Sequence, residues 1–164
     1  MKTGQLVDTL QMLYACHMKI TLCGSLAFID KMNDLKKQLE EMGHEVQLPP
    51  TTVTDNTGKV IPVVVLHQQR RETKETSGWI WDHKAEAMRN HFDKVTWCDA
   101  VIILNETKHS TAYYIGGNTL MEMGLAFYLK KKIYLMNPIP ELPYTEEIIG
   151  MRPTVINGNL LLVR

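Results

Sequence analysis

The chain has 164 residues, of which 45% are hydrophobic and 22% are charged. That length suits one domain with a buried core and is too short for two comfortable ones. Eighteen basic and eighteen acidic residues cancel to a formal charge of zero. We therefore expect neither a nucleic acid nor a membrane as a partner, and a small neutral or singly charged ligand fits better.

The three cysteines indicate neither a disulfide framework nor a metal site. Cys16, Cys23 and Cys98 form no closely spaced pair and lie mostly in apolar surroundings. This pattern favours reduced thiols in a cytoplasmic protein and argues against a bound metal. Nothing in the sequence indicates a cofactor, and we expect none.

The first residues are expected to form an appendage to the domain. Residues 1–17 precede Met18, where the sequence reads like a second natural beginning. They lack the charged-then-apolar order of a signal peptide, and no apolar run in the chain approaches the roughly 20 residues of a membrane span. We expect a short helix, used in subunit contact, with these residues on one face: Leu6, Leu10, Leu13 and Tyr14.

From Met18 onward, short apolar runs alternate with segments of helical periodicity, which is typical of a parallel sheet with crossover helices. The pattern predicts strands at 19–24, 44–49, 99–105, 131–138 and 153–158. It predicts helices at 28–42, 82–97, within 114–126 and near 144–151. We expect a single α/β domain over 18–164, Rossmann-like or flavodoxin-like, with a five-stranded parallel sheet and helices on both faces.

Residues 51–80 are polar and too long for an ordinary connection. Loops of that size in compact domains are usually functional lids or disordered segments. We expect a mobile lid or a hairpin here in preference to an inert insertion. Trp79 and Trp81, at the end of this segment, are candidates for stacking on a base.

Three segments follow the predicted strands at their carboxyl ends, where open parallel sheets bind ligands. They are Gly24 and Ser25, residues 105–117, and residues 137–140. We expect them to be neighbours. The Gly24–Ser25 turn just before a helix offers free backbone N–H groups to a phosphate, although the same dipeptide is also an ordinary strand-to-helix turn.

Glu122 is a single acid among apolar residues at the start of a predicted helix. If Asn118 caps that helix, Glu122 lies about one turn in, where the helix dipole keeps it ionised at neutral pH. An ionised carboxylate in an apolar wall suits a nucleophile toward an anomeric carbon. A glutamate that serves the helix dipole or a buried ion pair is an equally good interpretation of this residue alone.

The wider pattern resembles the nucleoside 2-deoxyribosyltransferase family, in particular its nucleotide-cleaving branch, the 2'-deoxynucleoside 5'-phosphate N-hydrolases. The similar parts are "CGS" after the first strand, "DAVIILN" as the middle strand, and "EMGLA" followed by "KKIYLM". The likeness covers residues 19–137 without the 51–80 segment. It implies that Glu122 attacks C1' of the deoxyribose and that Gly24 and Ser25 bind the 5'-phosphate.

Three positions depart from the family's pattern. His91 stands where the family commonly has an aspartate that protonates the leaving base or orients the sugar. An imidazole whose pKa is near the working pH suits a general acid, and a packing role is the alternative. Asn105 replaces an aspartate of the transferases, and Gly116 replaces a serine or aspartate of some members.

The candidate catalytic residues are Glu122, His91 and Asn105, and the candidate substrate-binding residues are Gly24, Ser25, Tyr114, Gly116, Gly117 and Asn118.

The resemblance implies an enzyme that cleaves the N-glycosidic bond of a (deoxy)nucleoside or its 5'-monophosphate, with water or a second base resolving a glycosyl–Glu122 intermediate. It also implies a homodimer or a higher homo-oligomer. A phosphoribohydrolase is a second candidate, because "GGNTLME" keeps part of that family's "PGGxGTxxE" motif, although it is one residue short and lacks the basic phosphate clamp. An NAD glycohydrolase and a non-catalytic nucleotide-binding module also stay open as functions.

Overall fold

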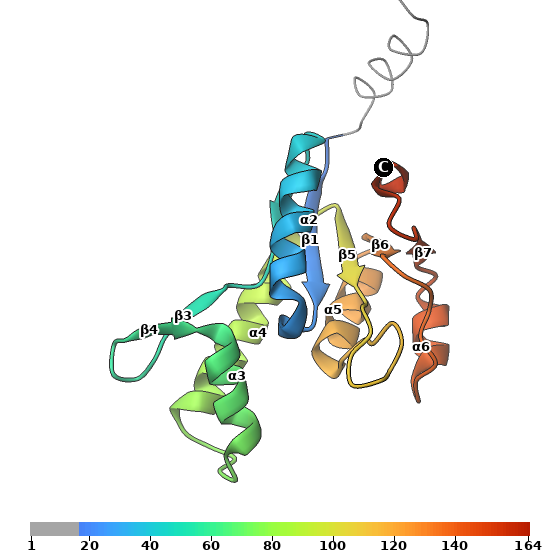
Figure 1. Cartoon of the computed structure of the whole chain (residues 1–164). Helices are drawn as coiled ribbons and strands as arrows, with labels where there is room; N and C mark the ends of the chain where they lie inside the picture. Colours follow the sequence, from blue (N-terminus) through green and yellow to red (C-terminus); the bar gives the residue numbers. More distant parts are fainter. Residues whose placement is uncertain (1–16) are drawn as a thin grey trace, which may run out of the picture.

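The computed structural model describes residues 17–164 (Figure 1). The expected appendage lies outside the described residues except for His17, and so does the helical face expected for Leu6, Leu10, Leu13 and Tyr14.

A five-stranded parallel sheet forms the centre of the fold (Figure 1). Its strands lie in the order β2 (Glu45–Gln47), β1 (Lys19–Gly24), β5 (Ala100–Leu104), β6 (Lys132–Leu135) and β7 (Thr154–Val155). Counted within the sheet this is the order 2-1-3-4-5 of flavodoxin-like folds, with the chain order reversing between β1 and β5. The predicted α/β fold with five parallel strands is confirmed.

Helices cover both faces of this sheet, because both faces of its central strands are apolar. Helix α2 (Ile29–Glu41) packs its buried face on one side, and α4 (Trp79–Trp97), α5 (Gly117–Tyr128) and α6 (Thr145–Gly150) cover the other. Successive strand residues point to opposite faces. In β1, Leu22 therefore joins the core beneath α2, and Cys23 joins the core beneath α4 and α5.

The helices begin close to the predicted positions, with two differences. A short 3-10 helix, η1 (Leu26–Phe28), precedes α2, and the Ser25 hydroxyl caps it by accepting a hydrogen bond from the backbone N–H of Ala27. A second 3-10 helix, η2 (Leu160–Leu162), lies near the end of the chain. No helix among residues 17–164 has both the length and the apolar character needed to cross a bilayer.

The 51–80 segment contains an antiparallel hairpin followed by a helix (Figure 1). Strands β3 (Thr52–Thr54) and β4 (Val60–Pro62) form the hairpin, and α3 (Val63–Glu72) continues directly from it. Two buried side chains of α3, Val63 and Leu66, anchor the helix, which lies beside α4 and η1. The segment is thus a structured extension of the domain, and its movement as a lid stays a prediction.

Replacing glycine by alanine should have opposite effects on stability at two positions, Gly24 and Gly124. A Cβ atom on Gly24 would lie 2.9 Å from the Leu104 carbonyl oxygen and 2.8 Å from Met32 Cε, so Gly24→Ala forces β5 or α2 to shift. We expect a loss of about 1–3 kcal/mol in the free energy of unfolding. Gly124 lies within α5 and a Cβ there meets nothing within 4 Å. Gly124→Ala should therefore gain roughly 0.5–1 kcal/mol. Urea unfolding of both variants checks this, and equal midpoints would contradict it.

Candidate active site

The start of α5 lies at the carboxyl end of β5, across a loop that runs from Asn105 to Gly116. The helix begins at Gly117 with Gly116 at the N-cap position, and no side chain caps it. The prediction that Asn118 is the cap is therefore wrong, because the extended backbone of Gly116 starts the helix two residues earlier. The first N–H groups of α5 are left to a ligand or to solvent.

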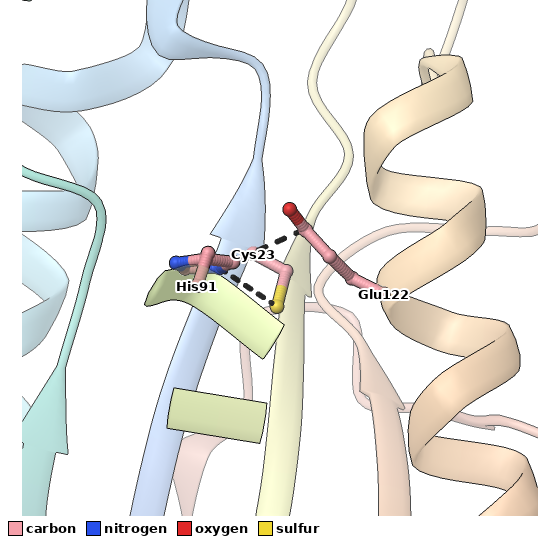
Figure 2. Close-up of side chains that lie close together, drawn as sticks. All are labelled: Cys23, His91 and Glu122. Atoms are coloured by element: carbon pink, nitrogen blue, oxygen red, sulfur yellow. Dashed lines mark hydrogen bonds and ion pairs between the residues drawn. The ribbon is translucent and has the colours of Figure 1, made fainter. Parts of the chain in front are cut away.

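Three buried side chains from three elements meet beside this helix start: Cys23 from β1, His91 from α4 and Glu122 from α5 (Figure 2). His91 Nε2 lies 3.7 Å from Glu122 Oε2 and 3.5 Å from Cys23 Sγ. Both helices turn their buried faces toward the side of the sheet on which Cys23 points. The fold therefore brings Glu122 and His91 together, as their family resemblance implies.

Burial shifts the pKa of both titratable partners toward their neutral forms. It raises the pKa of Glu122 from 4.5 to about 7, against the opposing effects of a hydrogen bond with Cys23 and the charge of Lys84. Burial also lowers the pKa of His91 from 6.5 to about 4, with the charge of Lys94 acting in the same direction. The expectation that Glu122 is kept ionised at neutral pH is met only in part, because desolvation raises its pKa to about 7.

The thiol of Cys23 is a neighbour that the sequence reasoning missed. Burial, followed by the nearby Glu122 carboxylate, raises the pKa of Cys23 well above 9.0, so the thiol stays protonated. A protonated thiol can donate a hydrogen bond to the ionised carboxylate, which accounts for its lowering effect on the pKa of Glu122. The "CGS" turn thus supplies a donor in addition to the flexible glycine and the hydroxyl.

Two buried atoms of the site have no hydrogen-bond partner among the described residues: Glu122 Oε2 and His91 Nδ1. A buried polar atom without a partner costs about 1–3 kcal/mol. Such atoms in a native fold are typical of catalytic and ligand-binding positions. His91 also lines a cavity of about 350 Å³, together with His83 and Asn90 of the same helix.

The same cluster is the place where a metal ion would fit best. The ligand atoms of Cys23, His91 and Glu122 lie within 4.8 Å of one another. Thiolate, imidazole and carboxylate are all zinc ligands, and three of them with one open position resemble a catalytic zinc site. The prediction that the protein binds no metal therefore needs a direct test by chelation.

The substrate-binding candidates line one cavity of about 340 Å³ near the junction of β1 and β5. They are Gly24, Ser25, Tyr114, Gly116, Gly117 and Asn118. This is the switch point of the sheet, where ligands bind in such folds. Trp81 lines the cavity as well, whereas Trp79 is absent from its lining and Asn105 lies elsewhere.

The side chain of Asn105 holds a neighbouring loop. Its amide nitrogen donates to the carbonyl oxygens of Pro138 (2.9 Å) and Asn137 (3.2 Å), and its oxygen accepts from the Asn137 N–H (2.9 Å). These bonds use both N–H donors of the amide and tie the end of β5 to the end of β6. Asn105 is suited to positioning the site, and a direct role in the chemistry stays a prediction.

Five basic residues also line the cavity, and the sequence reasoning missed them. They are His67, Arg70 and Arg71 of α3, Lys84 of α4, and Lys108 of the loop before α5. The spacing of His67, Arg70 and Arg71 at i, i+3 and i+4 is the signal that would have placed them on one helical face.

No protein-family model matches the chain, and no curated protein matches it in sequence. Among solved structures, it is similar to a 2-deoxyribosyltransferase from Bacillus psychrosaccharolyticus, with 16% identity, a TM-score of 0.44 and coverage of 71% of this chain and 69% of that one. It is also similar to the CMP N-glycosidase BcmB from Clostridium botulinum, with 16% identity, a TM-score of 0.42 and coverage of 83% of each chain. At such values neither likeness bears on substrate or mechanism.

The raised pKa of Glu122 predicts how stability changes with pH. Because the native carboxyl holds its proton more tightly than the unfolded one, Glu122 weakens the fold as the pH rises from 4.5 through about 7. The full difference corresponds to roughly 3 kcal/mol. The stability of Glu122→Gln relative to the natural protein should therefore increase between pH 5 and pH 8, measured by urea unfolding at both values.

The lowered pKa of His91 acts in the opposite direction, since stability from this group is lost as the pH falls from 6.5 toward 4. Comparing the two proteins at each pH removes most of that effect. Glu147→Gln, at an exposed position of α6, is the control and should show no such change. An equal difference at pH 5 and pH 8 for Glu122→Gln would contradict the raised pKa.

Proposed function

We propose that this protein is an enzyme that cleaves the N-glycosidic bond of a (deoxy)nucleoside or nucleoside 5'-monophosphate through a covalent bond between Glu122 and C1' of the sugar. The observation that carries the proposal is the buried Glu122 carboxyl with an unpartnered oxygen, 3.7 Å from His91 Nε2. Glu122 and His91 are not part of the lining of the cavity at the switch point, but Glu122 follows Thr119 of that lining by about one turn of α5. The sequence resemblance supports the same chemistry independently of the geometry.

In the first step, a lone pair of Glu122 Oε2 forms a bond to C1' while the electrons of the C1'–N bond leave with the base, which takes a proton from solvent water. The desolvated carboxylate stabilises the positive charge that develops on the sugar. In the second step, water or a second base attacks C1', the carboxylate leaves, and the attacking group gives up its proton to solvent. A pKa of about 7 leaves a large ionised fraction for attack at neutral pH.

His91 fits a positioning role better than that of a general acid. With its pKa lowered to about 4, the imidazole carries no spare proton at neutral pH. Its Nε2 lies 3.5 Å from Cys23 Sγ and 3.7 Å from Glu122 Oε2, so the ring packs against the carboxyl without a hydrogen bond to Oε2. Lys84, whose charge favours the ionised form of Glu122, is the nearby group that supports the nucleophile electrostatically.

The proposal is tested by incubating the purified protein with deoxynucleosides, ribonucleosides, their 5'-mono-, di- and triphosphates and NAD, with and without an acceptor base, and by measuring released base by chromatography. We expect release that rises with pH through about 7, as Glu122 loses its proton. Glu122→Gln should lower it by roughly a thousandfold or more. Dependence on the acceptor base distinguishes transfer from hydrolysis.

The exposed Glu147→Gln variant is the matched control and should keep full activity.

Dialysis against a chelator should leave the rate unchanged, and added zinc should inhibit by occupying the nucleophile. Activity lost on chelation and restored by zinc would replace the covalent mechanism with a metal-based one. Release from no substrate in the panel would overturn the proposal in favour of a nucleotide-binding module.

A further inference from the structure

Four cationic side chains gather on one wall of the cavity, from three separate parts of the chain. This cationic wall consists of Arg70 and Arg71 of α3, Lys84 of α4 and Lys108 of the loop before α5. The imidazole of His67 stands among them. Its pKa is lowered by burial and then by the charges of all four, which shows that they act on the same small region.

Within residues 17–164 the charges of the cationic wall are offset only by the Glu122 carboxylate, which acts on Lys84 without a salt bridge. None of its four members forms a salt bridge with an aspartate or glutamate there, and the cavity has no carboxylate in its lining. Burial, followed by the charge of Arg70, lowers the pKa of Lys84, and burial followed by the charge of Arg71 lowers that of Lys108. Partly buried like charges that repel one another need an anion to offset them.

The position of the first phosphate of such an anion follows from the candidate active site. Lys108 Nζ donates to the Ser25 hydroxyl at 2.8 Å, so both groups face the same point of the cavity. The uncapped start of α5, at Gly117 and Asn118, borders the same space. These groups suit a 5'-phosphate next to the sugar.

A single phosphate carries about two negative charges at neutral pH, which leaves half of the cationic wall uncompensated. Arg70 and Arg71 lie on the 51–80 extension rather than on the sheet itself. Their planar guanidinium groups match phosphate oxygens in pairs. The arginine side chains of α3 are therefore placed to bind further phosphates of the same ligand.

We propose that the ligand of this cavity is a nucleoside polyphosphate, whose phosphates beyond the first bind to Arg70 and Arg71. The inference rests on the proposed function for the nucleoside end of the ligand, and it replaces the monophosphate there by a di- or triphosphate. The extension formed by β3, β4 and α3 is then the part of the chain that selects the phosphate number.

Binding is measured by isothermal titration calorimetry with Glu122→Gln, which holds the ligand without turnover. The ligands are the deoxynucleosides, their 5'-mono-, di- and triphosphates, NAD, and inorganic triphosphate. We expect the affinity to rise at least tenfold from monophosphate to triphosphate, and inorganic triphosphate to compete. Adding Arg70→Gln and Arg71→Gln should remove most of that rise, whereas adding Arg89→Gln, at an exposed site of α4 outside the cavity, should retain it.

Circular dichroism verifies that the variants fold, and Arg71→Gln alone, at an exposed position, serves if the double change does not. Equal affinities for mono- and triphosphate, NAD binding more tightly than any triphosphate, or a rise that survives both arginine changes would overturn the inference. The readout is binding, so the two proposals fail separately. A polyphosphate preference without base release sinks only the proposed function, and base release without the preference sinks only this inference.

Discussion

The burial of one carboxyl group, that of Glu122, is the constraint around which the rest of the structure is arranged. Removing a carboxylate from water is costly, and here desolvation raises its pKa to about 7. The carboxyl can be buried because β1 and α4 each place one weakly polar side chain beside it, the Cys23 thiol and the His91 imidazole. Neither partner is charged at neutral pH, so the carboxyl is not locked into an ion pair. That state suits a group that must form a bond to carbon.

The sheet order decides where this carboxyl can act. The reversal between β1 and β5 opens the crevice that the glycine-containing turn, the α5 start and Tyr114 line. Asn105 ties the ends of β5 and β6 together at the same edge. The extension at 51–80 then closes one side of the cavity with α3. Although the formal charge of the chain is zero, four cationic side chains are concentrated on one wall of the cavity. The composition alone gives no sign of this cluster.

Local patterns were enough to predict the sheet and the nucleophile candidate. The run Ala100–Leu104 is buried throughout, and such an apolar run can be recognised without tertiary information. The cap of α5 was predicted wrongly, because it depends on the extended backbone of Gly116. The ionisation of Glu122 was predicted only in part, because it depends on desolvation by distant elements. The roles of Cys23, Arg70 and Arg71 were missed for the same reason. Each faces the site only once β1, α3 and α4 have packed.

The covalent bond between the Glu122 carboxylate and the sugar is the central claim to be tested. The most direct measurement is mass spectrometry of protein that is quenched in acid during turnover and then digested. We predict a sugar or sugar-phosphate mass on the peptide that carries Glu122, lost with Glu122→Gln and kept with Glu147→Gln. Rapid base release without any adduct on that peptide, or with the adduct on another residue, would contradict the covalent mechanism.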